Sequence, residues 1–394
     1  MGNIQNYQFY MPKLTLIGVN ALEKLGGELE KLRVKKALVV TDVFMAKSEI
    51  ISSVEKSLKT GGVGMSVYDG VEPNPKLSQV KAGTYRFVQD GCDMLVSLGG
   101  GSPHDCAKAI KFAVIRNEKF RIKEIPLAAV NTTAGTASEI TNCAVITDDE
   151  THHKVPILDA GIIPDIAVDD PMLMLKMPKG LTAATGMDAL THALEAYVAT
   201  GKNEITQAAA IRAIGLVDKY LYEAYCNGGD IEARNGMVYA EYLAGMAFSN
   251  AGLGLVHAMA HQLGGLYNLP HGVCNALLLP YVMAFNFKAV CGGYGEIAKS
   301  LRLCPMAQTD ERAAKTLIRY VVELGRRLNI PKSLAEIKVD AADCGRLAKM
   351  AGEDPFLASN PVQPTVEEIE KVFSDAWHGR LEILSAGTPL RNRP

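Results

Sequence analysis

Short apolar runs rich in β-branched residues alternate with amphipathic stretches over the first 180 residues. The apolar runs are 36–41, 64–68, 93–98 and 126–131. Segments with helical spacing, such as 47–60 and 76–90, lie between the first three runs. Strands that alternate with helices are typical of βαβ units on a mostly parallel sheet. The pattern therefore predicts an α/β nucleotide-binding domain over residues 1–180.

From Leu181 onward the strand pattern stops and helical periodicity takes over. Met187, Leu190, Leu194 and Val198, for example, repeat at the spacing of one buried helix face. The predicted helices are 182–200, 203–226, 230–250, 255–267, 272–287, 309–328, 341–351 and 365–385. We expect an all-α domain over residues 181–394, with the boundary inside 169–180.

Composition narrows the class of protein. The chain has 394 residues, of which 48% are apolar and 21% charged, with a net charge of −2, so neither nucleic acid nor an anionic membrane is an expected partner. The eight cysteines are scattered without a CxxC pair, which disfavours a zinc ribbon or a disulfide framework and fits a reducing compartment. No basic leader and no uninterrupted apolar stretch of about 18 residues occurs. We expect a soluble cytoplasmic protein.

A glycine-rich turn follows the third apolar run. Gly99, Gly100 and Gly101 lead to Ser102, a candidate helix N-cap, and to Pro103 at the expected first helical position. Glycines permit close approach of the backbone, and a helix N-terminus attracts phosphate. The sequence predicts a pyrophosphate site, although the spacing is not GxGxxG, and a plain strand-to-helix turn is the alternative.

Two further features could serve a nucleotide. Asp42 ends the run 36–41, where its carboxylate could accept both hydroxyls of an adenosine ribose and would repel a 2′-phosphate, which favours NAD over NADP. The loop 131–141 carries four threonines after another apolar run. That loop either contacts a cofactor or is simply a well-capped polar loop.

The stretch 242–287 contains no Asp, Glu, Lys or Arg, yet it contains three histidines. So uncharged a stretch should be buried, and burial of imidazoles without partners is costly. A nearby predicted helix offers a carboxylate and an imidazole four residues apart, on one face. The five candidate side chains are Asp188, His192, His257, His261 and His271.

Imidazoles with one carboxylate suit Fe(II), Zn(II), Ni(II) or Co(II). For any one of these histidines, the alternative is an ordinary hydrogen-bonded core residue. Five candidates are one more than a site with an open position needs, so we expect one of them to have another role.

These segments together resemble the iron-dependent, or group III, alcohol dehydrogenases, which include methanol, 1,3-propanediol, butanol and lactaldehyde-reducing enzymes. The resemblance spans most of the chain in order and is strongest in its last two segments. The matching segments are 40–42, 68–75, 99–110, 131–141, 184–197 and 252–280. It implies a dehydroquinate synthase-like architecture and an NAD-dependent alcohol dehydrogenase or aldehyde reductase for small primary alcohols or diols, built as a homo-oligomer, either a dimer or a decamer.

The resemblance also implies roles for individual residues. Fe2+, or alternatively Zn2+, is held by Asp188, His192, His257 and His271, while His261 relays a proton close to the metal and the nicotinamide. Substrate lies beside Phe248 and Phe356. NAD is bound, from the adenosine ribose along the pyrophosphate and onward, by Asp42, Asn74, Gly99, Gly100, Gly101, Ser102, Thr132, Thr133, Thr141 and Lys154.

The chain departs from the family pattern in three places. The segment 111–130 is several residues shorter than usual, which is expected to alter a loop near the cofactor. Phe356 replaces a small cysteine of some relatives, and Val362 replaces an arginine that commonly follows Asn-Pro. These two changes are expected to narrow the pocket toward small alcohols.

Three rival interpretations remain. Glycerol dehydrogenase and dehydroquinate synthase also pair NAD with a divalent metal on this scaffold. The synthase needs basic residues for an anionic substrate, which the stretch 242–287 lacks. The third rival is a non-catalytic assembly protein, against which the presence of all candidate metal and cofactor residues argues.

Overall fold

The computed structural model describes residues 6–120, 122–151 and 153–384 and divides into two compact units. The first unit contains the described residues up to Thr132, together with Ala137–Ile146 and Val155–Asp170. The second unit contains Thr133–Thr136, Thr147–Lys154 and the described chain from Pro171 onward. Each unit is considered by itself below.

The first unit is built on a six-stranded sheet in which every pair of neighbours is parallel. Along the sheet the strands follow the order β1-β8-β5-β4-β2-β3. Their bounds are β1 Leu14–Ile17, β2 Lys36–Val40, β3 Gly64–Tyr68, β4 Met94–Gly99, β5 Leu127–Asn131 and β8 Ile166–Asp169. The central strands are buried apolar runs, as expected where helices cover both faces.

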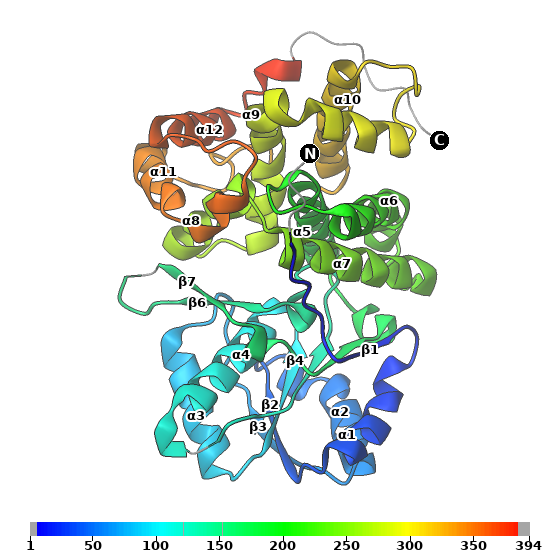
Figure 1. Cartoon of the computed structure of the whole chain (residues 1–394), viewed down its shortest axis with the longest axis vertical. Helices are drawn as coiled ribbons and strands as arrows, with labels where there is room; N and C mark the ends of the chain where they lie inside the picture. Colours follow the sequence, from blue (N-terminus) through cyan, green and yellow to red (C-terminus); the bar gives the residue numbers. More distant parts are fainter. Residues whose placement is uncertain (1–5, 121, 152, 385–394) are drawn as a thin grey trace. The chain divides into compact units, whose positions relative to one another are not determined.

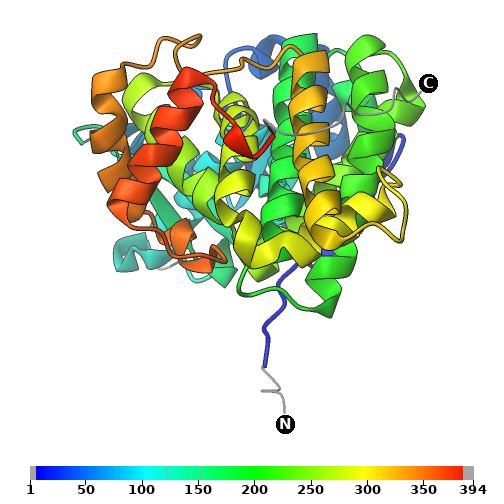
Figure 2. The same ribbon diagram turned by 90° about the horizontal axis from the view of Figure 1, so that it is seen from above.

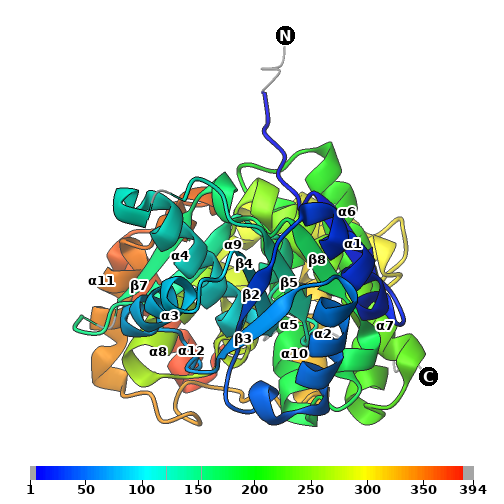
Figure 3. The ribbon, with the colours of Figure 1, turned by 90° about the horizontal axis from the view of Figure 1, so that it is seen from below.

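Two pairs of helices cover the two faces of this sheet (Figure 3). Helices α1 (Leu25–Leu32) and α2 (Glu49–Thr60) lie on one face, and α3 (Leu77–Gln89) and α4 (Gly101–Arg116) on the other. Right-handed crossovers require this arrangement, because the chain steps along the sheet in opposite directions before and after β3. The α/β class predicted from the sequence is confirmed.

Two details of the first unit differ from the sequence prediction. Strands β1 and β8, which have four residues each, and the two-stranded sheet of β6 (Cys143–Thr147) and β7 (Lys154–Leu158) were not predicted from the sequence. Helix α4 begins at Gly101, after Gly100 as its N-cap, and no side chain caps it. Ser102 is therefore not the N-cap but lies in the first turn, where Pro103 is also tolerated.

The second unit is helical, as predicted, and its helices lie side by side in a bundle (Figures 1 and 2). Helix α5 is buried at every residue from Thr182 to Val198 and packs against α6, α7 and α9. The helices are α5 Lys179–Val198, α6 Glu204–Cys226, α7 Ile231–Ala251, α8 Leu255–Tyr267, α9 His271–Ser300, α10 Asp310–Arg327, α11 Cys344–Gly352 and α12 Val366–His378. A helix that is buried on every face is a core helix, so the polar side chains of α5 must find partners inside the protein.

Helix α9 continues well beyond the predicted end at residue 287. It runs to Ser300 through a break in helical geometry at Val290, where φ is −128°, and it contains Pro280. Its length and apolarity would suffice to cross a membrane, but 72% of its most apolar window is buried inside the protein. The helix therefore has the burial of a core helix.

Candidate metal centre

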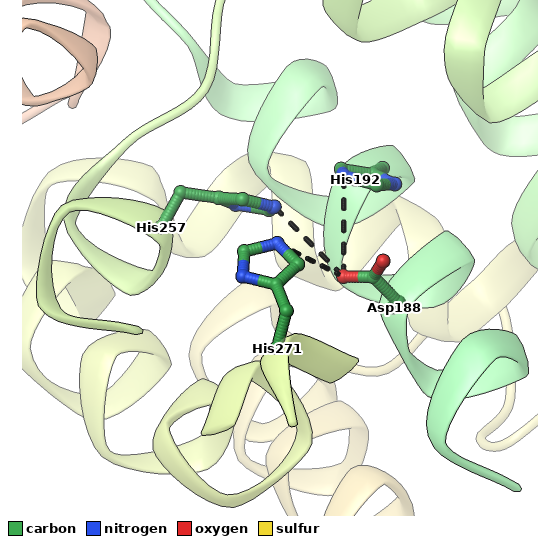
Figure 4. A group of neighbouring side chains, drawn as sticks. All are labelled: Asp188, His192, His257 and His271. Carbon is green, nitrogen blue, oxygen red and sulfur yellow. Dashed lines mark ion pairs between the residues drawn. The ribbon is translucent and has the colours of Figure 1, made fainter. Parts of the chain in front are cut away.

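Four side chains from three helices of the second unit converge on one point (Figure 4). Asp188 and His192 come from α5, His257 from α8, and His271 is the first residue of α9. The Nε2 atoms of the histidines lie 4.0, 3.9 and 3.8 Å from Asp188 Oδ1, in chain order. All four candidate ligand atoms lie within 4.8 Å of one another. Four bonds of about 2.1 Å to a tetrahedral ion separate ligand atoms by about 3.4 Å, so small side-chain movements suffice for coordination.

Local sequence explains this convergence. Asp188 and His192 are one helical turn apart and therefore share a face of α5. Gly252 follows α7 with a φ of +90°, which lets the chain turn into α8. At Gly272, a Cβ atom would lie 2.5 Å from the carbonyl oxygen of Ala184, so only glycine lets the start of α9 approach α5 this closely.

Three residues of the centre are buried and His271 is partly exposed, and burial is the main influence on the protonation of the group. Asp188, His192 and His257 are 1%, 3% and 1% exposed. Burial is the main cause that raises the pKa of Asp188 to about 7. It also lowers the pKa of each of the three histidines well below 6.5, which leaves neutral rings with a lone pair to donate. Three neutral nitrogens and one carboxylate oxygen suit a borderline divalent cation.

Hydrogen bonds at Nδ1 aim two of the rings. His257 Nδ1 lies 2.5 Å from Glu195 Oε2, and His192 Nδ1 lies 3.2 Å from the carbonyl oxygen of Gly135. The carbonyl can only accept, so the His192 ring carries its proton on Nδ1 and presents the Nε2 lone pair to the centre. A carboxylate at Glu195 fixes His257 in the same way, as is usual around metal-binding histidines.

Glu195 was not predicted from the sequence, although it lies seven residues after Asp188 and so on the same face of α5. Its Oε1 accepts a hydrogen bond from the backbone nitrogen of Val256 at 2.8 Å. Burial is the main cause that raises the pKa of Glu195 to about 8, while backbone N–H groups, including that of Val256, lower it. The positive charge of a bound cation would favour the carboxylate form, which is the form that fixes His257.

His261 lies next to the centre but outside the group of four. Its Nδ1 is 2.9 Å from Oδ2 of Asp354, and its ring stacks on that of His271 with centroids 5.5 Å apart. Asp354 was also missed, because no local pattern links it to a histidine 93 positions earlier.

Two aromatic rings line the group of histidines. The Phe248 ring stacks on His192, with centroids 4.2 Å apart and planes 23° apart. The Phe356 ring meets His261 edge-on, with centroids 5.2 Å apart. Both residues predicted to contact substrate therefore lie against imidazoles of this cluster.

Within the first unit, most of the predicted cofactor residues lie at the carboxyl edge of the sheet. Asp42 follows β2, the glycine turn ends β4, and Thr132 follows β5, with its backbone nitrogen 2.9 Å from the Gly99 oxygen. From β2 the chain proceeds to β3 on one side, and from β4 it proceeds to β5 on the other side, so the direction of the connections reverses between β2 and β4. Ligands of open α/β sheets bind at such a point. The arrangement can receive a nucleotide there.

The glycine turn itself fits a phosphate. Gly99 has a φ of +142°, and a Cβ atom on it would lie 2.7 Å from Pro103. Helix α4 has 16 residues and no side-chain cap, so the N–H groups of Gly101 and Ser102, which have no acceptor within the helix, are the donors that it offers to an anion. Asp42 Oδ1 accepts from the backbone nitrogen of Met45 at 2.8 Å, which orients the carboxylate.

The remaining predicted cofactor residues lie in different parts of the two units. Asn74 lies in the loop after β3 with a φ of +57°. Thr141 is buried, and its hydroxyl accepts from the buried Lys108 at 2.9 Å. Thr133 and Lys154 belong to the second unit.

Comparison with known proteins gives a consistent picture. Residues 12–171 match the family model of iron-containing alcohol dehydrogenase, and residues 182–377 match the C-terminal model of the Fe-containing alcohol dehydrogenase family. The NAD-dependent methanol dehydrogenase of Bacillus methanolicus is 42% identical over 93% of this chain and 99% of its own. The lactaldehyde reductase of Escherichia coli K12 is 38% identical over 91% and 97%. The solved structure of an alcohol dehydrogenase from Oenococcus oeni is 41% identical, with a TM-score of 0.91 over 94% of this chain and all of that one.

Proposed function

Because the chain belongs to the iron-containing alcohol dehydrogenase family, as the resemblance in its sequence predicted, we propose that it interconverts small primary alcohols or diols and their aldehydes with NAD and a divalent metal. Fe2+ is the expected ion and Zn2+ the alternative. The observation that carries this proposal is the convergence of Asp188, His192, His257 and His271, whose ligand atoms lie within 4.8 Å of one another.

The residues divide the chemistry between them. A divalent cation at the centre supplies Lewis acidity, which lowers the pKa of an alcohol hydroxyl or polarises an aldehyde carbonyl. Glu195 and the Gly135 carbonyl orient two of the ligating rings. With Asp354 bonded to its Nδ1, His261 has Nε2 left to exchange the substrate proton. Phe248 and Phe356 offer an apolar wall that suits a short carbon chain.

The nucleotide is assigned to the first unit. NAD supplies the hydride acceptor. The N–H groups at the start of α4 and the bare backbone of the glycine turn are suited to its pyrophosphate. Asp42 is suited to the hydroxyls of the adenosine ribose and disfavours a 2′-phosphate by charge repulsion.

The proposal also includes a cellular compartment and an oligomeric state. All eight cysteines are free thiols, which fits a reducing compartment such as the cytoplasm. We assign it a homo-oligomeric state, which sedimentation of the purified protein would measure.

The test is NADH formation by metal-stripped protein reconstituted anaerobically with Fe(II) or, separately, with Zn(II). Methanol, ethanol, 1-butanol, 1,2-propanediol and 1,3-propanediol are the substrates, and the Asp188→Ala variant is the control. Turnover that depends on both the metal and Asp188 is expected. Absence of turnover with every alcohol, while NAD and metal both bind, would refute the proposed substrate class.

A further inference from the structure

One buried amide lies among the ligand atoms of the metal centre. Asn275 follows His271 by one turn of α9, and its side chain is 0% exposed. Its Nδ2 lies 2.6 Å from Oδ1 of Asp188. The same nitrogen lies 3.0 Å from Nε2 of His257 and 3.0 Å from Nε2 of His271. Three of the four candidate ligand atoms therefore share a single NH2 group.

The direction of these hydrogen bonds has a chemical consequence. An amide NH2 group has two hydrogens, which it divides among these three atoms, and it has no lone pair with which to accept. An imidazole nitrogen that faces it must therefore carry a lone pair rather than a proton, which places the lone pair of His257 and of His271 on Nε2. A cation at the centre requires the same ring form. For His257 that form is also fixed by Glu195 at Nδ1, 2.5 Å away. For His271, the described structure shows no hydrogen-bond partner at Nδ1, so the contact with Asn275 is the one that selects the form.

The hydrogen bonds of Asn275 go to ligand atoms alone. Its Oδ1 is buried and has no partner among the described residues. Buried amides usually satisfy both ends, as Asn286 does farther along the same helix, where it exchanges two hydrogen bonds with Asn360. Asn275 thus leaves its oxygen unpaired while its nitrogen contacts the candidate ligand atoms. An unpaired buried oxygen is unfavourable, so the amide is not placed there to satisfy its own hydrogen bonds.

We propose that Asn275 is a positioning residue of the metal centre. Its NH2 group holds Asp188, His257 and His271 close to ligand spacing, and keeps His271 in the ligating tautomer, before a cation arrives. The centre is then pre-organised, so less ordering remains to oppose binding. This inference rests on the proposed metal-dependent function.

The test compares Asn275→Leu, which has a similar shape but cannot donate, with Asn286→Leu as a matched control. Asn286 is another buried amide on the same helix, and its side-chain hydrogen bonds go to Asn360. Full-length protein is stripped of metal and titrated with Co(II) in competition with a chromophoric chelator. Asn275→Leu is expected to weaken Co(II) binding by about 10- to 100-fold, as for other residues that orient metal ligands. Asn286→Leu is expected to bind Co(II) as the unaltered chain does.

A second measurement separates positioning from general damage to the core. In metal-free protein with 15N-labelled histidine, NMR reports which nitrogen of each ring carries the proton. His271 is expected to move its proton to Nε2 in Asn275→Leu, whereas His257 keeps its proton on Nδ1 because Glu195 remains. If the leucine variant does not fold, Asn275→Ala takes its place in both measurements.

The outcomes distinguish the two proposals. If the unaltered chain binds no Co(II), the proposed metal function fails. If it binds Co(II) and Asn275→Leu binds equally well, or both leucine variants weaken binding alike, the role of Asn275 is overturned. An unchanged His271 tautomer in the variant would overturn it as well.

Discussion

The Glu195→Gln substitution replaces one carboxylate oxygen by an NH2 group and keeps the shape of the side chain. It therefore tests the hydrogen bond between Glu195 and His257, a proposed metal ligand. The carboxylate of Glu195 faces two groups, the Nδ1 of His257 at 2.5 Å and the backbone nitrogen of Val256 at 2.8 Å. A carboxylate can accept from both. Glutamine has one oxygen, so one of the two contacts must meet its NH2 group.

Either orientation of the glutamine weakens the centre. If the NH2 group faces His257, the ring must accept at Nδ1 and carry its proton on Nε2, where it blocks coordination. If it faces Val256, two buried donors oppose each other, at a cost of about 1–3 kcal/mol. A tenfold change in affinity corresponds to about 1.4 kcal/mol, so metal binding is expected to weaken by about 10- to 100-fold.

The assay is competition between the protein and a chromophoric chelator for Zn(II) at one fixed pH. Asp354→Asn is the matched control, since it alters the same kind of carboxylate–imidazole contact at His261, which lies outside the group of four ligands. That control is expected to keep metal affinity and to lower NADH-forming turnover. Undiminished affinity in Glu195→Gln, or an equal loss in Asp354→Asn, would refute the reasoning.

Three other changes test separate features. Asp42→Gly is expected to raise kcat/KM with NADP relative to NAD, and an unchanged ratio would show that Asp42 is not at the ribose. Gly272→Ala places a Cβ atom 2.5 Å from the α5 backbone and should cost about 1–3 kcal/mol in denaturant unfolding and displace His271, whereas Gly292→Ala on the same helix meets nothing within 4 Å and should cost nothing. Burial is the main cause that lowers the pKa of His104 from 6.5 to about 3, so the unfolded chain protonates first and stability falls as pH drops below 6.5. Between pH 8 and pH 5 this contribution amounts to about 2 kcal/mol, and a His104→Gln variant that loses as much stability as the unaltered chain would contradict the assignment.

The residues that converge at the candidate metal centre could be predicted from the sequence because their signals are local. The Asp188 and His192 pair shows the spacing of one helix face, and the three histidines stand out in a stretch without charged residues. The position of His261 outside the group of four could not be predicted from local sequence. Its partner Asp354 lies 93 positions away and approaches it only in the folded chain. Asn275 is an ordinary polar residue until its distances to the ligand atoms are known.

The sheet shows the same division between local and distant causes. The buried strands β2, β4 and β5 are apolar enough to be predicted alone, whereas β1 and β8 have four residues each and are defined by pairing with each other across about 150 positions. At the glycine turn the sequence predicts the change from strand to helix but not the residue at which the helix begins, because Gly100 adopts the N-cap geometry and no side chain caps the helix.

The proposed metal ligands come from α5, α8 and α9, so a cation bound by them would link three helices of one core. An ion that binds the folded chain alone stabilises it by mass action, by about 2.7 kcal/mol when its free concentration is 100 times the Kd. A stabilisation of that size lowers the fraction of unfolded molecules, which are the ones that proteases cleave, by about a hundredfold. The amount of this protein that survives in a cell is therefore expected to follow the supply of the ion, so that scarcity removes the polypeptide as well as its activity.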